Sequence, residues 1–430
     1  MKIILLEPIK EPNTKSISLP GSKSLTNRAL IMTTLSNGKN TISNASVSDD
    51  CLVMIQILKQ LGINIISRNN FLEIQGNGGN FPKQNHSFNI ADAGTAMRYL
   101  TAVCSLIPGE IIFDGSERMR ERPIGELVEA LKKLGPKIEY LEKNGFPPIK
   151  IQGGKLIGGN ISVKGSISSQ FFTALLLIAP ILQNGLTIQV IGEQVSKSYI
   201  DMTIEGLKKF GVNVKNRNYQ KYSIGKNQKY KPCRYEVEGD ATGASYFWAI
   251  AAVTGKKIKV KNINTQSVQG DTKFPDLLEK MGCTVIKNNK ANSITVQGPK
   301  QLKGIDIDMS SMPDTIQTLA VVAAFAKGAT KITGAKTLRI KETDRLYALQ
   351  TELQKMNIES QIDDESITIK GGCPIGAQIK TYDDHRMAMA FSIAGAKIKG
   401  VKIENPDVVH KSFPDFWDKV MNLGVGIKTI

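Results

Sequence analysis

The sequence predicts an α/β protein made of six similar repeats, three in each of two domains. The first observation is a glycine that closes an apolar helical segment and recurs at intervals of 70 to 76 residues: Gly38, Gly109, Gly185, Gly255, Gly328 and Gly400. The second is an interleaved series of helix ends with the pattern apolar-x-x-apolar-Gly, which closes at Gly62, Gly135, Gly211, Gly282, Asn357 and Gly424. Twelve matches in the same order do not arise by chance.

Each repeat of about 70 residues therefore contains two helices among short strands, and a chain of 430 residues has room for two domains. Glycine, or once asparagine, falls at these helix ends because the residue there must adopt a left-handed conformation. From composition alone, the polar, turn-rich segment 216–234 is the expected domain boundary. The first strand, at residues 3–6, could pair in either domain.

The composition, with 41% hydrophobic and 22% charged residues, is that of a soluble globular protein. No apolar run has the length of a membrane span, and the N-terminus is strand-like with an acidic residue, unlike a signal peptide. We therefore expect a cytoplasmic protein. The five cysteines are scattered without a CxxC spacing, and only three histidines are present. This pattern indicates reduced thiols and argues against a zinc site, and we expect neither a metal nor a cofactor.

The net charge of +17 is compatible with nucleic-acid binding, with an anionic small-molecule substrate, or with a lysine-rich surface. The basic residues are spread over the whole length, without a block of five or six and without interleaved aromatic residues. This distribution disfavours nucleic acid and leaves an anionic substrate open.

A charged stretch, Arg339-Ile-Lys-Glu-Thr-Asp-Arg345, comes immediately before a helix whose apolar residues recur at helical spacing. Thr343 or Asp344 can cap this helix, and Asn357 can end it. The free N–H groups and the dipole of a helix start favour an anion, and two cations beside a carboxylate suit phosphate binding with proton transfer. A solvated, salt-bridged helix start would have the same sequence.

Helix starts in the first two repeats carry similar groups. Lys23, Ser24 and Arg28 follow a glycine-containing turn, with Ser24 as a possible N-cap. The turn lacks the spacing of a Walker A loop, so a simple anion site fits it better. Small residues around Gly94 let a ligand approach backbone N–H groups, and three arginines, the last of them Arg122, precede the next helix.

The third repeat opens its helices with Ser168-Ser-Gln170 and Ser196-Lys-Ser-Tyr199, which suit a polyhydroxylated, phosphorylated ligand, although serine caps alone would look similar. The fifth and sixth repeats add Asp314, Asp384-His-Arg386 and Lys411. The candidate proton carriers are Lys23, Asp314, Glu342 and His385. Helix starts that face each other across a cleft would form an electropositive pocket for a polyanion.

Seven motifs in this order point to one family: Pro20-Gly-Ser-Lys-Ser24 with Asn27-Arg28, Ala93-Gly-Thr-Ala-Met-Arg98, Arg122-Pro-Ile-Gly125, Ser168-Ser-Gln170, Lys341-Glu-Thr-Asp-Arg345, Asp384-His-Arg386 and Lys411-Ser-Phe-Pro414. Together they resemble the 5-enolpyruvylshikimate-3-phosphate (EPSP) synthases, and the resemblance spans nearly the whole chain. It implies a two-lobed enolpyruvyl-transferase fold of six βαβαββ repeats, three per domain, with helix N-termini that face the interdomain cleft. It also implies a discontinuous domain of residues 1–19 and 238–430, which the first strand joins, and an inserted domain of residues 20–237.

The reaction implied by the resemblance transfers the enolpyruvyl group of phosphoenolpyruvate to the 5-hydroxyl of shikimate 3-phosphate and releases phosphate. It proceeds by addition and elimination through a tetrahedral intermediate, and without a metal. The implied partners are these two small molecules, with no nucleic acid and no membrane, and the implied state is a monomer.

The resemblance also implies roles for individual residues. The proton-transfer candidates are Lys23, Asp314 and Glu342. The residues expected to bind phosphoenolpyruvate are Lys23, Gly94, Arg122, Gln170, Arg345, His385, Arg386 and Lys411. Those expected to bind shikimate 3-phosphate are Ser24, Arg28, Ser168, Ser169, Gln170, Ser196, Tyr199, Asp314 and Lys341.

Several positions depart from the family pattern. Ala91 stands where glycine is usual, and Asp92 where asparagine is usual. Tyr99 and Ser198 each replace a common proline, and Thr337 replaces an asparagine. These departures affect the shape of the phosphoenolpyruvate pocket, and with it the sensitivity to glyphosate-like inhibitors.

Two alternatives remain at this level. The sister enzyme that transfers enolpyruvyl to UDP-N-acetylglucosamine usually carries a loop cysteine, which segment 114–120 lacks, and it also lacks the pattern of segment 341–345. A basic, non-enzymatic nucleic-acid-binding repeat protein would explain the net charge, but not Asp314, Glu342 and Gln170 at helix starts.

Overall fold

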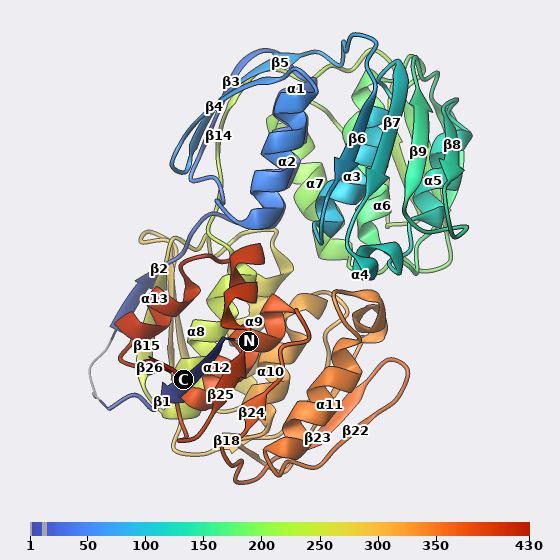
Figure 1. Cartoon of the computed structure of the whole chain (residues 1–430). Coiled ribbons are helices and arrows are strands. Elements are labelled where there is room, and N and C mark those ends of the chain that lie inside the picture. Colours follow the sequence, from blue (N-terminus) through green and yellow to red (C-terminus); the bar gives the residue numbers. More distant parts are fainter. Residues whose placement is uncertain (1, 11–14) are drawn as a thin grey trace. The chain divides into compact units, whose positions relative to one another are not determined.

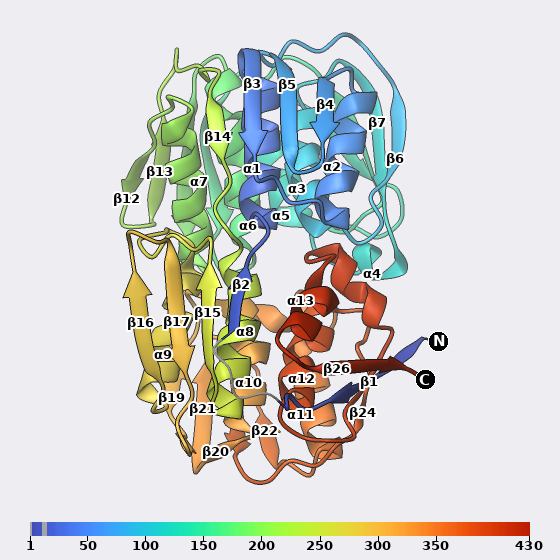
Figure 2. The ribbon, with the colours of Figure 1, turned by 90° about the vertical axis from the view of Figure 1, so that its left-hand side faces the viewer.

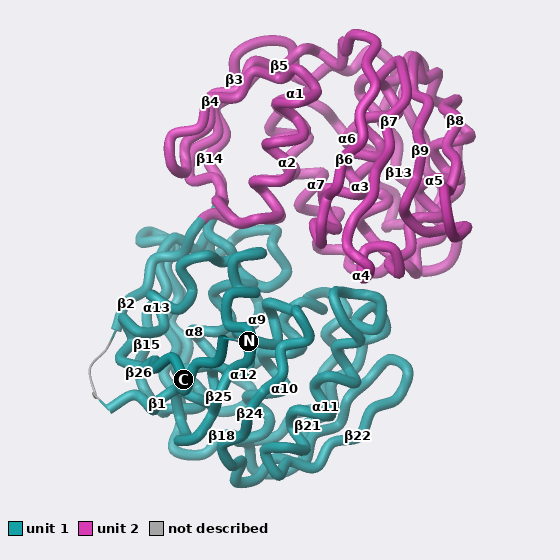
Figure 3. The backbone as a smooth tube through the Cα atoms, in the orientation of Figure 1, with its two compact units in different colours: residues 1–20, 238–430 teal, residues 21–237 magenta. Residues whose placement is uncertain are grey.

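The computed structural model describes residues 2–10 and 15–430, which divide into two compact units. Unit 1 spans residues 1–20 and 238–430, and unit 2 spans residues 21–237 (Figure 3). Each unit has its own cluster of buried hydrophobic residues, so each is built around a separate core.

Unit 2 contains three four-stranded sheets among its described residues, each with one parallel pair followed by two antiparallel pairs. In sheet order the strands are β14 (Arg234–Glu236), β3 (Asn37–Ser43), β5 (Phe71–Asn77) and β4 (Asn64–Arg68); β6 (His86–Asn89), β7 (Gly109–Asp114), β9 (Ile149–Gly153) and β8 (Lys137–Tyr140); and β10 (Gly159–Lys164), β11 (Leu186–Ile191), β13 (Lys221–Ile224) and β12 (Lys215–Arg217).

Unit 1 repeats the same pairing three times. Its sheets are β2 (Lys15–Ser18), β15 (Lys257–Lys261), β17 (Ser293–Gln297) and β16 (Thr284–Asn288); β19 (Asp306–Asp308), β21 (Ala329–Thr333), β23 (Ile367–Lys370) and β22 (Ser360–Ile362); and β24 (Gln378–Ile379), β25 (Lys402–Glu404), β1 (Ile3–Glu7) and β26 (Gly426–Thr429). A short pair, β18 (Leu302–Lys303) and β20 (Ala326–Lys327), is added. The predicted six repeats are therefore present as six copies of one strand arrangement.

The composition-based boundary at 216–234 is wrong. Strands β12 and β13 of that segment form an antiparallel hairpin within a sheet of unit 2, and β14 then pairs with β3 before the chain leaves the unit. The segment is polar because β12 is a fully exposed edge strand, not because it links domains. The first strand, β1, pairs with β25 and β26 and so belongs to unit 1.

Each unit packs three deeply buried helices against three partly exposed ones (Figures 1 and 2). The buried helices are α1 (Lys23–Leu35), α3 (Gly94–Cys104) and α6 (Ser169–Ile178) in unit 2, and α8 (Ala241–Thr254), α10 (Ile316–Ala323) and α12 (His385–Gly395) in unit 1. Every residue of α3, α10 and α12 is buried, which fits sequences that are mostly apolar or small.

The partly exposed helices are α2 (Asp49–Gln60), α5 (Gly125–Lys132), α7 (Lys197–Lys209), α9 (Phe274–Lys280), α11 (Arg345–Lys355) and α13 (Phe416–Asn422). Shorter turns are α4 (Glu117–Arg120) and the 3-10 helices η1 (Ala179–Ile181), η2 (Gly270–Lys273), η3 (Pro313–Thr315), η4 (Lys336–Ile340) and η5 (Pro406–Lys411). None of the described helices is both long enough and apolar enough to cross a membrane.

The second predicted series of helix ends is confirmed, because each of its residues comes within three residues of the last residue of a helix. In the first series only Gly255 ends a helix directly, whereas the other five glycines lie in, or just before, the strand that follows the helix. All twelve residues of the two interleaved series have a positive φ, between 60° and 130°. Asp344 caps α11 by accepting a hydrogen bond from the N–H of Tyr347 at 3.2 Å, and Asn357 follows that helix with φ 60°. The expectation of Ser24 as an N-cap is wrong, because α1 already begins at Lys23 and Ser22 precedes it.

Asn357 tests whether backbone geometry alone determines which residue type these positions accept. Its side chain is exposed, so packing contributes little, and its φ is positive. Asn357→Gly should change the free energy of unfolding by only a few tenths of a kcal/mol, whereas Asn357→Ala should lower it by about 1 kcal/mol, since a Cβ disfavours this conformation. Urea unfolding followed by circular dichroism measures both. Equal stability of the alanine and glycine variants would contradict the backbone argument.

Candidate active site

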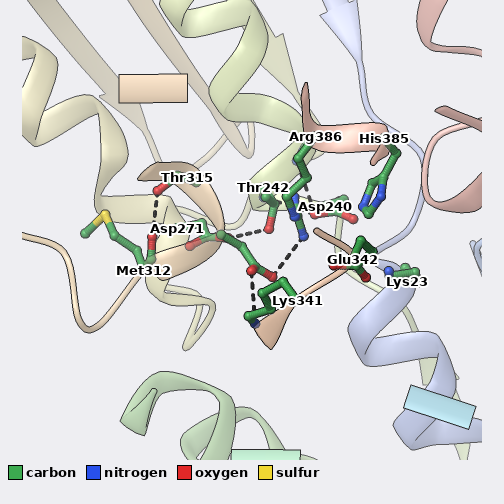
Figure 4. A network of polar contacts seen from close by, with 12 residues as sticks. Lys23, Asp240, Thr242, Asp271, Met312, Thr315, Lys341, Glu342, His385 and Arg386 are labelled. Carbon is green, nitrogen blue, oxygen red and sulfur yellow. Dashed lines mark hydrogen bonds and ion pairs between the residues drawn. The ribbon is translucent and has the colours of Figure 1, made fainter. Parts of the chain in front are cut away.

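In unit 1, three cations converge on the carboxylate of Asp314, which lies in η3 just before α10. Arg386 Nη2 lies 2.9 Å from Asp314 Oδ2, and Lys341 Nζ and Arg345 Nη1 lie 3.3 Å and 3.2 Å from Oδ1. Lys341 and Arg386, both labelled in Figure 4, reach this carboxylate from different segments. Asp314, Lys341, Arg345 and Arg386, which the sequence analysis names in three separate segments, therefore lie together in unit 1.

Burial on its own would raise the pKa of the Asp314 carboxyl group. The attraction of Arg386, Lys341 and Arg345 outweighs burial and holds this pKa well below its ordinary value. Asp314 is therefore ionised at neutral pH. As long as all three cations remain in contact with it, it is a weak proton acceptor.

Arg345, the first residue of α11, joins three carboxylates while being almost completely buried. Its Nε lies 2.7 Å from Asp384, its Nη2 lies 2.8 Å from Glu342, and its Nη1 contacts Asp314. Burial would lower the pKa of the guanidinium group, but Asp384, Glu342 and Asp314 raise it instead, so its charge is permanent. The planar guanidinium fork fixes where these carboxylates lie.

His385 and Arg386 open α12, whose N-cap is Asp384. The Asp384 carboxylate accepts a hydrogen bond from the N–H of Arg386 at 2.9 Å and lies 3.5 Å from Nδ1 of His385. The preceding turn contains Tyr382 and Asp383, both with positive φ near 54° and 53°. The sequence did not single out Asp384 as a site residue, although its place before an apolar helix is a recognisable capping signal.

The buried carboxylate of Glu352 holds this turn in place. It accepts hydrogen bonds from the Tyr382 hydroxyl at 2.7 Å and from the N–H of Lys380 at 3.1 Å, and it pairs with Lys355. Glu352 lies on α11 two turns beyond Arg345, so one helix carries a site residue at its start and supports the start of α12 further along. Periodicity does not reveal such a role.

In unit 2, Lys23 is the first residue of α1 and its Nζ lies 2.8 Å from Oδ2 of Asp50. Both side chains are largely buried. Asp50 stands in the first turn of α2, after the N-cap Ser48. The sequence reasoning missed Asp50, because nothing in the spacing of 27 residues says that these two helix starts meet.

Arg28 connects α1 with α7. It donates to the hydroxyl of Thr203 and to the carbonyl oxygens of Ser24 and Tyr199, each at 2.9 Å. Its guanidinium also lies over the ring of Tyr99, 5.8 Å from the ring centroid. Tyr99, which departs from the family pattern, thus supports a predicted substrate-binding residue, and its burial raises the pKa of its hydroxyl.

Gly94 and Arg122 are in close contact. A Cβ at Gly94 would lie 2.6 Å from Nη1 of Arg122, so a larger residue would displace the guanidinium. Arg98 ties the two segments together by donating to the carbonyl oxygens of Gly94 at 3.2 Å and of Pro123 at 2.8 Å. Gln170 reaches the same region through a 3.4 Å hydrogen bond to Thr95.

The other predicted residues take the following places. Ser168 caps α6 by accepting from the N–H of Gln170, and Ser169 is the first residue of that helix. Ser196 precedes α7 with φ 52°. Lys411 ends η5 and is buried.

Three of the residues that depart from the family pattern have the following surroundings. Ala91 has φ 46°, a conformation that glycine adopts without strain, which explains why glycine is usual there. The Asp92 carboxylate accepts a hydrogen bond from the hydroxyl of Ser116, the N-cap of α4. Thr337, in η4, is nearly buried.

Each unit therefore presents a set of cations, hydroxyls and carboxylates at or near its helix starts. Comparison of the whole chain with known proteins gives its family. The family model of EPSP synthase (3-phosphoshikimate 1-carboxyvinyltransferase) matches residues 9–420. The chain belongs to the EPSP synthase family. A 3-phosphoshikimate 1-carboxyvinyltransferase from Shewanella sp. (strain W3-18-1) is 44% identical over 428 residues, 98% of this chain and 100% of the relative. The corresponding protein of Colwellia psychrerythraea is 45% identical over 425 residues, 98% of this chain and 99% of the relative.

The fold agrees with that membership. The structure matches a solved EPSP synthase from Acinetobacter baumannii with a TM-score of 0.84 and 25% sequence identity, over 100% of both chains. The predicted enolpyruvyl-transferase fold is therefore confirmed.

Removing the central cation of the unit 1 site tests its electrostatic design. Arg345→Met should lower the free energy of unfolding by about 3–5 kcal/mol near pH 7, because three carboxylates lose their shared buried partner. The loss should shrink as the pH falls below 3.8, the ordinary pKa of an aspartate. Asp314 has a lowered pKa in the folded protein, so its favourable contribution is present above its unfolded pKa and is lost as acid protonates it.

Urea unfolding at several pH values measures the effect. Arg339→Met is the matched control, because Arg339 forms a more exposed ion pair with Asp344 and should cost at most about 1 kcal/mol. A loss for Arg345→Met that is as small as the control, or that grows with acid, would refute the assignment.

Proposed function

We propose that the helix-start residues of both units carry out the reaction of the EPSP synthase family in this chain. The enzyme transfers the enolpyruvyl group of phosphoenolpyruvate to the 5-hydroxyl of shikimate 3-phosphate and releases phosphate, a step of the shikimate pathway to aromatic amino acids. The observation that carries the assignment of residues is the pair of carboxylates, Asp314 and Glu342, held among Lys341, Arg345 and Arg386.

The reaction requires proton transfers at two places. The 5-hydroxyl must lose a proton as its oxygen attacks C2 of phosphoenolpyruvate, and C3 must gain one, which gives the tetrahedral intermediate. Elimination then expels phosphate and removes a proton from C3. We assign the hydroxyl proton to Asp314 and the C3 proton to Glu342 and Lys23, which lie at helix starts with a cation or carboxylate in contact.

The cations around Asp314 provide a trigger for this chemistry. In the structure they lower the pKa of Asp314 and so weaken it as a base. An anionic substrate that draws Arg386 or Lys341 toward itself removes part of that attraction, and the basicity of Asp314 then rises. Substrate binding would thereby activate the proton acceptor at the moment when it is needed.

The remaining predicted residues bind the substrates. Phosphoenolpyruvate is held by Lys23, Gly94, Arg122, Gln170, Arg345, His385, Arg386 and Lys411, and shikimate 3-phosphate by Ser24, Arg28, Ser168, Ser169, Gln170, Ser196, Tyr199, Asp314 and Lys341. Guanidinium groups suit the phosphate and carboxylate groups, and the serine hydroxyls suit the hydroxylated ring. We further propose a cytoplasmic monomer, whose evenly spread basic residues favour these small anions over nucleic acid.

Phosphate release on mixing the protein with phosphoenolpyruvate and shikimate 3-phosphate tests the function, with UDP-N-acetylglucosamine as the parallel acceptor. We expect release with shikimate 3-phosphate only. Lys23→Ala and Glu342→Gln should each lower kcat by about 10²- to 10⁴-fold, the range typical of lost acid–base groups.

Matched controls are Lys59→Ala and Glu279→Gln, which change exposed residues of α2 and α9. Both should behave as the wild type. Release with UDP-N-acetylglucosamine instead would change the assigned acceptor. Full activity of Glu342→Gln would remove Glu342 from the mechanism.

A further inference from the structure

A buried carboxyl group near the unit 1 site has no role in the mechanism above. Asp271 lies in η2 and is 5% exposed. Its carboxyl group accepts a hydrogen bond from the hydroxyl of Thr242, in the first turn of α8 (Figure 4). Gln269 fixes η2 against the same helix start, because its side chain accepts from the N–H of Ala241 at 3.2 Å and donates to the carbonyl of Gly239 at 3.0 Å.

The surroundings of Asp271 are unlike those of Asp314. Within residues 2–10 and 15–430, the Asp271 carboxyl group has no cation within ion-pair distance, and its hydrogen-bond donor is a neutral hydroxyl. A buried carboxylate without a cation is costly, so the group retains its proton to higher pH. Burial raises the pKa of Asp271 to about 7, the Thr242 hydrogen bond lowers it, and the charge of Asp314 raises it.

The charge of Asp271 matters because charged groups of the neighbouring site lie close to it. These groups are Asp240 at the start of α8, Asp314 in η3 and Arg386 in α12. Arg386 also pairs with Asp314, 2.9 Å away. A negative charge on Asp271 would attract Arg386 and so compete with an anionic substrate for it.

We propose that Asp271 is a positioning residue that keeps a proton beside Asp314 at acidic pH and releases it in the neutral range, and that loss of this proton weakens the binding of phosphoenolpyruvate. The role acts through Arg386 and Asp314, and Asp271 itself touches no substrate. It rests on the proposed function, which places Arg386 at phosphoenolpyruvate. Asp271 then makes the affinity for this substrate depend on pH in the neutral range.

The KM for phosphoenolpyruvate between pH 5.5 and 9 tests the role. In the wild type the KM should rise as the pH passes through about 7, and in Asp271→Asn, which keeps the Thr242 hydrogen bond but cannot ionise, this rise should be lost. The difference at alkaline pH should be on the order of tenfold. The kcat should change less than the KM, which separates an electrostatic effect on binding from a general loss of structure.

Two further variants sharpen the comparison. Thr242→Val removes the hydrogen-bond donor that favours the ionised form of Asp271, so the rise in KM should move to higher pH. At alkaline pH this variant should therefore have a lower KM than the wild type, which general damage to the site would not produce. Asp276→Asn is the control, because Asp276 lies on the adjoining α9 and pairs with Lys287 at a half-exposed site. It should retain the wild-type profile. If Asp271→Asn does not fold, the direction of the Thr242→Val shift alone decides.

Thermal unfolding without substrate tests the proton separately. A group whose pKa is raised on folding stabilises the folded state below its unfolded pKa, and this contribution is lost as the pH rises through the folded pKa. The Tm of the wild type should therefore fall relative to Asp271→Asn between about pH 4 and about pH 7. A Tm difference that is constant over this range would show that Asp271 holds no extra proton, and would overturn the proposal.

The two measurements distinguish the possible failures. The expected Tm change together with identical KM profiles for the wild type and Asp271→Asn would refute the positioning role and leave the proposed function standing. A wild-type protein that releases no phosphate would refute the proposed function and the positioning role with it. The Tm comparison would still decide whether Asp271 is the buried acid described here.

Discussion

The unit 1 site depends on the buried guanidinium of Arg345. Without it, Asp314, Glu342 and Asp384 would be like charges in a space where water cannot screen them. With it, each carboxylate has a fixed position, and Asp384 is free to cap α12 and to orient Arg386 and His385. A buried ion network of this kind adds little stability by itself, and it is strongly destabilising when one member is lost. Its value here is that it places reactive groups without relying on flexible surface side chains.

The repeat architecture explains why such groups can be buried at all. The inner helices α1, α3, α6, α8, α10 and α12 are packed on nearly all sides, so most of their residues are apolar or small. The buried Arg28 and Arg98 are exceptions whose guanidinium groups are hydrogen-bonded. Their N-termini also accommodate buried polar groups, because free N–H groups there donate hydrogen bonds to carboxylates, as in the Asp240 cap of α8 and the Asp384 cap of α12. Six copies of one strand arrangement therefore supply many equivalent positions at which chemistry can be placed.

The sequence predicts the parts of this design that are local. The twelve turn positions could be predicted because positive φ selects glycine or asparagine at each of them, although in the first series most mark the start of the next strand and not the helix end itself. The Asp344 cap could be predicted because its signal lies within four residues. The composition-based boundary was wrong because an exposed edge hairpin has the same polar composition as a linker. Asp50 and Glu352 were missed because their partners come from other segments, Lys23 from α1 and Tyr382 from the turn before α12. No spacing rule contains those distances, whereas the family motifs name most of the remaining proposed site residues.

Asp314 and Asp271 are neighbouring buried aspartates whose pKa values are shifted in opposite directions. Both are buried, and burial pushes the pKa of each upward. Three cations reverse that effect at Asp314. Asp271 accepts a hydrogen bond from a neutral hydroxyl instead, and its pKa remains raised, at about 7. The two pKa values are thereby forced apart, which is the arrangement that lets neighbouring acids differ in protonation. A neutral Asp271 does not compete with the substrate for Arg386. The more strongly the substrate attracts Arg386 away from Asp314, the better a base Asp314 becomes.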